Sequence, residues 1–322
     1  MTPDSLIFVA GHQGLVGSAI VRRLQGAGFT NLVLRQRREV DLREQAAVET
    51  FFTQVRPEYV FLAAAKVGGI LANDSYPAEF LRDNLAIQTN VIDAAYRNGT
   101  RKLLFLGSSC IYPKHAPQPM SEDCLLTGPL EPTNEWYAIA KIAGLKMCQA
   151  YRRQYGFDAI CAMPTNLYGP GDNFDLRSSH VLPALIRKFH EAKTQGTDAV
   201  EIWGTGKPRR EFLHVDDLAD ACVFLMQRYS GDNCVNVGWG TDIPIAELAA
   251  LAAKTVGYEG ALRYNTSMPD GTPRKLLDVS RLSSLGWTAK IPLDAGIAAT
   301  YAWFAQNQST GSVSISKAGR VA

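Results

Sequence analysis

The sequence predicts an α/β protein in which a doubly wound parallel sheet is joined to a smaller mixed α/β domain. Apolar, β-rich segments alternate with segments of helical spacing through the first half of the chain, a pattern typical of a parallel sheet covered on both faces. A glycine-rich turn joins the first strand to the first helix. After about residue 168 the alternation gives way to loops and shorter elements, which indicates a second domain.

Five apolar segments of the first half are expected to be strands. They are continuous apolar runs, as in strands that are buried on both faces. The first starts close to the N-terminus without a basic leader before a long apolar run, so we expect a strand there and no signal peptide. The expected strands are residues 5–11, 31–35, 59–65, 102–107 and 158–164.

Helical spacing of apolar residues predicts the connecting helices. The first and the third end at glycines, Gly28 and Gly99, where helices commonly stop. Right-handed crossovers between the strands then give a doubly wound sheet. The helices expected in the first half are residues 15–28, 44–55, 79–99 and 135–156.

The second half is expected to form the smaller domain, with some elements crossing back to the first. It contains helical patterns at 180–193, 216–229 and 243–257, strand and turn at 199–215, and a short strand at 234–238. The last residues lack aromatics and periodicity, as mobile termini do. The expected boundaries are 1–168 for a dinucleotide-binding domain, with 214–230 packing back onto it, 169–310 for a substrate-binding domain, and 311–322 for a mobile tail.

The composition is that of an ordinary globular protein with a core. Of 322 residues, 46% are hydrophobic and 20% are charged, and the net charge is +2. This balance gives no general basis for binding nucleic acid or a membrane surface, and no segment reaches the roughly 18 uninterrupted apolar residues of a membrane span. We therefore expect no nucleic-acid and no membrane partner.

Six cysteines are present, with no C-x-x-C pair and none beside histidine at zinc-ligand spacing. This spacing argues against a zinc site. We expect no metal, reduced thiols and a cytoplasmic location.

A glycine-rich turn, VAGHQGLVGSAI, follows the first strand, with Gly11, Gly14 and Gly17 spaced three apart. Glycine permits a tight turn and close approach of the backbone to a pyrophosphate, and the next helix offers free N–H groups and a partial positive charge. In this strand–turn–helix context we expect a dinucleotide site. A tight turn without a ligand is the alternative.

The end of the second strand indicates which dinucleotide binds. An acidic residue there would favour a free ribose 2′-hydroxyl. The chain instead has RQRRE, so Arg35, Arg37 and Arg38 are candidates to bind a 2′-phosphate, which favours NADP(H) over NAD. A solvated basic turn is the alternative. Asp41 and Leu42 follow, where a side chain could meet the adenine.

Two pairs of residues suggest chemistry at the end of the fourth strand. Ser108 and Cys110 follow this strand directly, either to cap a turn or to face a cleft. Tyr137 and Lys141 lie four residues apart on one helical face, where a lysine cation lowers the pKa of the phenol from about 10. The pair could then exchange a proton with a sugar oxygen while a nicotinamide exchanges hydride. The alternatives are a surface pair for Tyr137 and Lys141, and a small buried hydrophobe for Cys110.

Several stretches together resemble the extended short-chain dehydrogenase/reductase family, over nearly the whole chain to about residue 307. They are the glycine turn, LAAAKVGG, LGSSCIYP, YAIAK, PTNLYGPGDNF and REFLHVDD. More narrowly, the chain is similar to the members that convert GDP-4-keto-6-deoxy-D-mannose to GDP-L-fucose, in AAAKVGGI, SSCIYPK, EPTNE, MPTNLYGP and PDGTPRKLLD. The resemblance implies a Rossmann fold for the first domain.

The resemblance also implies a 3,5-epimerase and 4-reductase. It places Ser108 at the carbon-4 oxygen of the substrate beside Tyr137 and Lys141, with Cys110 as the base of the epimerisations and His180 as its partner acid. These residue types fit the chemistry, because an enolate formed at either neighbouring carbon puts charge on the carbon-4 oxygen, where two hydroxyls can stabilise it. A thiol and an imidazole titrate close enough to neutrality to move the protons.

The implied cofactor residues lie in the glycine turn and at the strand ends. With Lys141 and His180, they are Gly11, His12, Gln13, Gly14, Leu15, Val16, Gly17, Arg37, Arg38, Asp41, Leu42, Leu106, Gly107, Ser108, Ser109, Pro164, Thr165, Asn166 and Leu167. Family members often carry arginine where Gln13 stands, and glutamine brings no charge to a 2′-phosphate. A preference for NADP(H) then depends on Arg37 and Arg38, and relaxed cofactor choice stays open.

Basic residues of the second half would hold the diphosphate of the substrate. The resemblance implies substrate contacts from Lys188, Trp203, Arg210 and Asp270, with Lys188 and Arg210 at the diphosphate. Arg187 and Arg209 remain alternatives, and such residues are often merely solvated. The family forms homodimers through two long helices, here residues 84–97 and 137–155.

Two other functions stay open at this point. The chain could be another nucleotide-sugar epimerase or reductase of the family, or a non-catalytic NADP-binding regulator. Dehydratases of the family typically have an acidic residue at the place of Cys110, and 4-epimerases lack a thiol there, so the chain differs from both. The intact set of Ser108, Cys110, Tyr137, Lys141 and His180 argues against the regulator.

Overall fold

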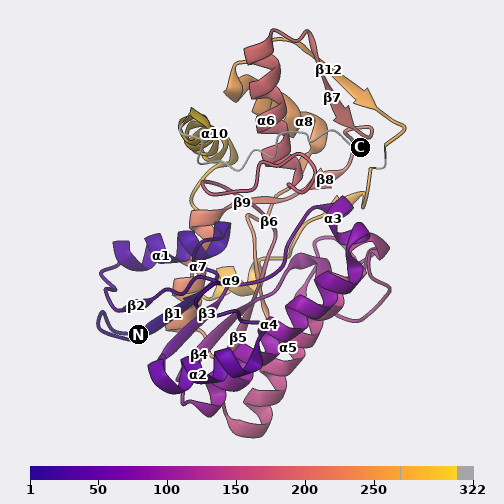
Figure 1. The fold of residues 1–322 in the computed structure, drawn as a ribbon. Coiled ribbons are helices and arrows are strands. Elements are labelled where there is room, and N and C mark those ends of the chain that lie inside the picture. The colour runs from indigo at the N-terminus through magenta and orange to yellow at the C-terminus, as the bar shows by residue number, and fades with distance from the viewer. Residues whose placement is uncertain (269, 310–322) are drawn as a thin grey trace.

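The computed structural model describes residues 1–268 and 270–309, which form two lobes (Figure 1). One lobe is built on a single parallel sheet with strands β1 (Ile7–Ala10), β2 (Leu32–Val33), β3 (Tyr59–Leu62), β4 (Lys102–Leu106), β5 (Asp158–Pro164) and β10 (Val235–Val237). Their order is β10-β5-β4-β3-β1-β2, so the chain winds from β1 in both directions. The predicted class, a doubly wound parallel α/β sheet, is confirmed.

Helices cover both faces of this sheet because successive strand residues point to opposite sides. In β4, Leu103 and Phe105 face a core shared with α2, α4 and α5, whereas Leu104 and Leu106 face a core shared with α1, α7 and α9. β10, expected within the second domain, pairs with β5 and completes the sheet. The helices are α1 (Leu15–Gly26), α2 (Gln45–Val55), α4 (Pro77–Arg97), α5 (Glu135–Tyr155), α7 (Val215–Arg228) and α9 (Ser280–Ser284).

The second lobe has an apolar core of its own, between α6 (Val181–Gln195), α8 (Ile245–Val256) and α10 (Leu293–Ser309). Short strands connect it to the sheet edge: β6 (Asn166–Tyr168) pairs with β9 (Phe212–His214), and β8 (Arg209–Arg210) lies between β11 (Ile243–Pro244) and β13 (Arg274–Lys275). The remaining elements are β7 (Ala199–Trp203), β12 (Ala261–Asn265), α3 (Ile70–Ser75) and the 3₁₀ turns η1 (Ser109–Ile111), η2 (Glu122–Cys124) and η3 (Pro132–Asn134).

A fully buried carboxylate, Glu211, joins the two lobes between β8 and β9. Its Oε1 accepts a hydrogen bond from the backbone N–H of Gly240 at 2.7 Å, and its Oε2 accepts one from Leu277 at 3.0 Å. Its carbonyl accepts from the side-chain amide of Asn166 at 2.8 Å. Gly238 leaves room for the carboxylate, since a Cβ there would lie 2.3 Å from Oε1. Glu211 thus ties β8 and β13 to the carboxyl edge of the sheet.

The two long helices α4 and α5 pack closely because Gly144 has no side chain. A Cβ at this position would lie 2.4 Å from the Phe105 ring and 2.8 Å from the Gln88 side-chain oxygen. The amide of Gln88 donates to the carbonyl of Ala140 at 2.6 Å. This bond fixes the turn of α5 that precedes Lys141.

Among the helices of residues 1–268 and 270–309, none combines the length and the hydropathy that a bilayer crossing requires. The tail predicted at residues 311–322 lies outside the described residues.

The variant Gly144→Ala should lose about 1–3 kcal/mol of unfolding free energy, because the added methyl group overpacks the contact between α5, α4 and the sheet. Gly26→Ala is the matched control, since nothing lies within 4 Å of its added Cβ and α1 gains roughly 0.5–1 kcal/mol of helical stability. Urea unfolding followed by circular dichroism measures both. Equal shifts in the two variants would contradict the close packing.

Candidate active site

The glycine turn forms a cradle without side chains at the N-terminus of α1. Gly11 has φ +83°, and a Cβ on it would lie 2.8 Å from the backbone of Ala64. A Cβ on Gly17 would lie 2.0 Å from the Gly11 carbonyl oxygen. Within the described chain, the buried Nδ1 of His12 has no hydrogen-bond partner. The close turn, the helix N-terminus and the unpaired nitrogen fit a pyrophosphate.

Ser108 and Cys110 lie where β4 ends and both stabilise a turn and face the site. Ser108 is the N-cap of η1, with its Oγ 3.4 Å from the backbone N–H of Cys110. The Cys110 thiol donates to the same oxygen at 3.1 Å and is only 9% exposed. The cap therefore fixes the thiol and the hydroxyl side by side.

Tyr137 and Lys141 of α5 reach the same strand end. The Lys141 ammonium donates to the carbonyl of Leu106, the last residue of β4, at 2.8 Å. It also lies 5.7 Å from the centre of the Tyr137 ring and 4.8 Å from that of Phe105. A negative charge on Cys110 affects the pKa of both Tyr137 and Lys141, so all three belong to one electrostatic site.

Burial changes the pKa of this pair in opposite directions. It lowers the pKa of Lys141 to about 8. Burial, together with the charge of Cys110, raises the pKa of Tyr137 well above its usual value. The expectation that Lys141 lowers the Tyr137 pKa is therefore wrong for the chain alone, because desolvation outweighs the attraction of the cation. Tyr137 is a neutral phenol that can donate a proton.

His180 comes from the other lobe, as the residue that precedes α6. Its side chain is exposed, yet the surrounding protein and the nearby charge of Lys275 hold its pKa below the ordinary value. Lys275 also interacts electrostatically with Cys110. The charge of Lys275 therefore interacts with both the predicted base, Cys110, and the predicted acid, His180.

Sequence reasoning missed Lys275, Glu131 and Asn134, which line a cavity beside Cys110. Burial lowers the pKa of Lys275, while negative charges on Cys110 and Glu131 raise it. Glu131 also pairs with Lys114 at 3.0 Å. In the described chain the buried amide oxygen of Asn134 has no partner. The available signal was that these residues lie in the subfamily-specific stretches EPTNE and PDGTPRKLLD.

The predicted nicotinamide-side residues lie on two adjacent strand ends. Leu106 ends β4, and Gly107 and Ser109 come after it; Pro164 ends the parallel neighbour β5, and residues 165–167 come after it. The Gly107 N–H donates to the carbonyl of Ala162 at 2.9 Å, which aligns the two ends. The predicted adenosine-side residues lie apart from them, in the turn after β2.

The structure distinguishes the predicted diphosphate residues from their neighbours. Arg187 is buried and pairs with Glu191 at 2.7 Å, and Arg209 pairs with Asp242 at 2.7 Å. Lys188 instead donates to a backbone carbonyl. The charges of Arg187 and Arg209 are compensated, which leaves Lys188 and Arg210 as the candidates for an anionic substrate.

The predicted substrate residues fall into two adjoining groups. The Lys188 ammonium lies 5.6 Å from the ring of Trp203, whose side chain is 52% exposed. Asp270 accepts from the backbone N–H and the hydroxyl of Thr205 at 2.6 and 2.8 Å. Burial lowers the pKa of Arg210, and Asp270 opposes this effect. The predicted substrate residues thus include two cations and an exposed aromatic ring.

This combination defines a class: a nucleotide-binding α/β enzyme with serine, tyrosine and lysine at the carboxyl edge of its sheet. The chain belongs to the NAD dependent epimerase/dehydratase family, whose model matches residues 7–238.

Curated relatives match nearly the whole chain. It is 66% identical to GDP-L-fucose synthase 1 of Arabidopsis thaliana over 94% of this chain and 93% of that protein. It is 56% identical to GDP-L-fucose synthase of Escherichia coli (strain K12) over 94% of this chain and 97% of that protein.

Solved structures share the fold. A gdp-l-fucose synthetase from Naegleria fowleri bound to NADP superposes with a TM-score of 0.89 at 28% identity, over 96% of this chain and 97% of that one. A GDP-6-OMe-4-keto-L-xylo-heptose reductase from C. jejuni gives a TM-score of 0.92 at 41% identity, over 95% and 99% of the two chains.

In Lys275→Met, alkylation of Cys110 by iodoacetamide should slow, because the variant removes the cation that interacts electrostatically with this thiol. Peptide mass spectrometry identifies the modified thiol. Lys290→Met, a change at an exposed and distant lysine, is the control and should leave the rate unchanged. The same rate in both variants would show that Lys275 does not act on the thiol.

Proposed function

We propose that this chain is a GDP-L-fucose synthase. It epimerises GDP-4-keto-6-deoxy-D-mannose at carbons 3 and 5, and then reduces the carbon-4 ketone with NADPH to give GDP-L-fucose. The proposal is supported by 56–66% identity to synthases over nearly their full length. One observation supports it most directly: the Cys110 thiol lies 3.1 Å from the Ser108 hydroxyl at the strand end, where an epimerase requires a base.

NADP(H) is the cofactor that fits the chain. The cradle of Gly11, Gly14 and Gly17 suits the pyrophosphate, and the exposed Arg37 and Arg38 suit the 2′-phosphate. The strand ends at 106–109 and 164–167 would hold the nicotinamide. When bound, NADPH supplies the hydride for carbon 4.

The anionic part of the substrate belongs in the second lobe. Lys188 and Arg210, whose charges are not taken up by a short ion pair in the described chain, would bind the two phosphates. Trp203 offers an exposed aromatic ring beside Lys188, and Asp270 lies near Arg210. This arrangement directs the keto sugar toward the sheet edge.

Epimerisation uses the groups around the ketone. Ser108 and Tyr137 donate hydrogen bonds to the carbon-4 oxygen, so the charge of an enolate formed at carbon 3 or carbon 5 is stabilised there. Cys110 removes the proton from the carbon, and His180 returns one from the opposite face. The charge of Lys275 lies within electrostatic reach of the Cys110 sulfur. The surrounding protein and the charge of Lys275 lower the pKa of His180, so its protonated imidazolium gives a proton readily to the carbon.

In the reduction step, the same carbon-4 oxygen receives a proton. Tyr137, neutral because burial raises its pKa, gives its proton to the carbon-4 oxygen as the alcohol forms. Lys141 stabilises the resulting phenolate by its charge. One hydroxyl pair therefore serves both halves of the reaction.

We also propose a cytoplasmic homodimer formed through α4 and α5. Trp136, Ile139 and Tyr155 on α5 are large apolar side chains that remain exposed in the single chain. All six cysteines are free thiols, as a reducing compartment requires.

In deuterated water, the wild-type product should carry deuterium at carbons 3 and 5, by mass spectrometry and NMR. Cys110→Ser should slow this exchange roughly 100-fold, the typical worth of a positioned base, and should slow reduction of an already epimerised substrate much less. Cys124→Ser, a change at a partly exposed cysteine, is the control. A product without deuterium would refute the epimerase half.

Tyr137→Phe should lower the rate of NADPH oxidation roughly 100-fold or more, because the proton donor is lost, and should leave the Kd for NADPH nearly unchanged. Absorbance of NADPH measures the rate, and fluorescence titration measures binding. Tyr155→Phe alters an exposed tyrosine of the same helix and should change neither. A normal reduction rate in Tyr137→Phe would exclude the proposed role.

A further inference from the structure

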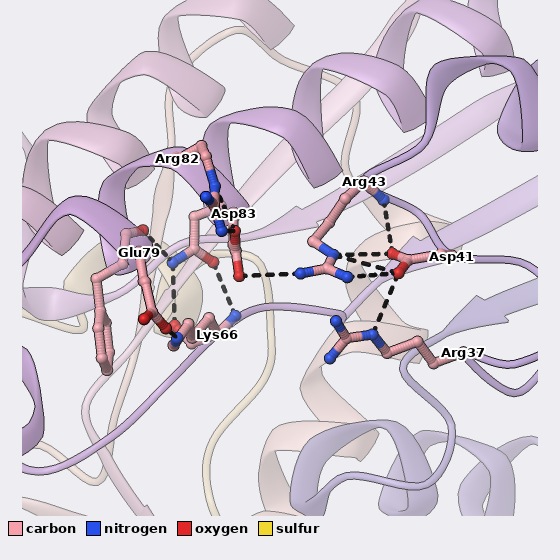
Figure 2. A network of polar contacts seen from close by, with 9 residues as sticks. Arg37, Asp41, Arg43, Lys66, Glu79, Arg82 and Asp83 are labelled. Carbon is pink, nitrogen blue, oxygen red and sulfur yellow. Dashed lines mark hydrogen bonds and ion pairs between the residues drawn. The ribbon is translucent and has the colours of Figure 1, made fainter. Parts of the chain in front are cut away.

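Ion pairs connect the turn after β2 to the first half of α4 (Figure 2). Asp41 accepts hydrogen bonds from both Arg37 and Arg43. The opposite side of the Arg43 guanidinium lies 3.4 Å from Asp83 of α4, which also accepts from Arg82 at 2.9 and 2.7 Å. The adenosine-side turn is therefore anchored to a helix of the sheet domain.

Arg43 compensates most of the negative charge of Asp41. Its Nη2 and Nε lie 2.7 and 3.0 Å from the two carboxylate oxygens, and its backbone N–H donates at 3.1 Å. The Nε of Arg37 reaches the same carboxylate at 3.3 Å only, on a side chain that is 70% exposed, against 29% for Arg43. Paired, partly buried bonds to a charged group are stronger than one exposed contact. Hydrogen bonds from Arg43 hold the pKa of Asp41 well below its usual value, so Asp41 is ionised.

Arg37 remains available to an incoming anion. Only its Nε contacts Asp41, and its two terminal nitrogens have no hydrogen-bond partner in the part of the chain that the structure describes. A guanidinium with this edge open can donate two parallel hydrogen bonds to a phosphate. The next residue, Arg38, is exposed as well.

The glycine turn has no lysine or arginine that could pair with the 2′-phosphate of the coenzyme. Residues 11–17 include one titratable side chain, His12, and carry Gln13 at an exposed position. Selection of a phosphorylated ribose then depends on the turn after β2. Without Arg43, the Asp41 carboxylate would pair with Arg37 and repel a second anion close by.

We propose that Arg43 is a positioning residue for coenzyme selectivity: by pairing with Asp41, it leaves the two terminal nitrogens of Arg37 free to bind the 2′-phosphate of NADP(H). The inference rests on the proposed function, from which it takes the identity of the coenzyme. Asp83 holds the Arg43 guanidinium from the far side. Arg43 itself need not touch the coenzyme.

The test compares the Kd values of NADPH and NADH by fluorescence titration of the purified full chain, without sugar nucleotide. Arg43→Leu should weaken NADPH binding roughly tenfold, the equivalent of one charge-assisted hydrogen bond, and should leave NADH binding unchanged because NADH lacks the 2′-phosphate. Adding Asp41→Asn to Arg43→Leu should restore most of the loss. Arg43→Lys, which keeps the charge, should retain most of the preference.

Arg82→Leu is the matched control, because Arg82 is 72% exposed and pairs with Asp83, not with Asp41. It should leave the ratio of the two Kd values unchanged. Thermal unfolding establishes that each variant is folded, and Arg43→Gln replaces the leucine variant if that one is not.

An unchanged Kd ratio in folded Arg43→Leu protein would overturn the proposal. Equal weakening of NADPH and NADH would also overturn it, since a purely structural role affects both coenzymes. Wild-type protein with no preference for NADPH would overturn it as well. Turnover of GDP-4-keto-6-deoxy-D-mannose by the same preparation shows separately whether the proposed function holds.

Discussion

The geometry of the site depends on one buried carboxylate, Glu211. Among the described residues it has no cationic partner, and backbone N–H groups from two remote segments satisfy it. A buried acceptor that lost these donors would cost free energy, so its position is strongly determined. Arg210 precedes Glu211 directly, and the Glu211 N–H donates to the carbonyl of Lys275 at 3.3 Å. Arg210, a proposed substrate-binding residue, and Lys275, which interacts electrostatically with Cys110, are therefore oriented from inside the protein.

Exclusion of water also affects the protonation of Tyr137 and Lys141. Burial favours the neutral forms of both Tyr137 and Lys141, so the phenol keeps its proton and the lysine comes close to losing its own. The bond from Lys141 to Leu106 joins helix α5 to the end of β4. Since Ser108 lies two residues further along, this contact also positions Tyr137 and Ser108, the two hydroxyls that we propose bind one substrate oxygen.

Local patterns in the sequence were sufficient for five of the six strands of the parallel sheet, for the glycine turn and for the helical pair of tyrosine and lysine. They failed where distant segments meet. Lys275 lies beside Cys110 only because β13 pairs with β8, and the direction of the Tyr137 pKa depends on burial, which composition does not reveal. The choice between Lys188 and its neighbour Arg187 required knowing that Arg187 already pairs with a glutamate. Strands of two or three residues, such as β8 and β13, have too little periodicity to be recognised.

The ion pairs around Asp41 join the turn after β2 to α4 (Figure 2). β2 is an edge strand of the sheet, whereas Ser108 and Cys110 follow β4 in its interior. On the proposed role of Arg43, natural variation in this turn would redirect the enzyme from one reductant pool of the cell to another without changing the residues proposed for its stereochemistry. For protein engineers, the turn is a self-contained segment that could be exchanged between homologues to match the redox supply of a production host.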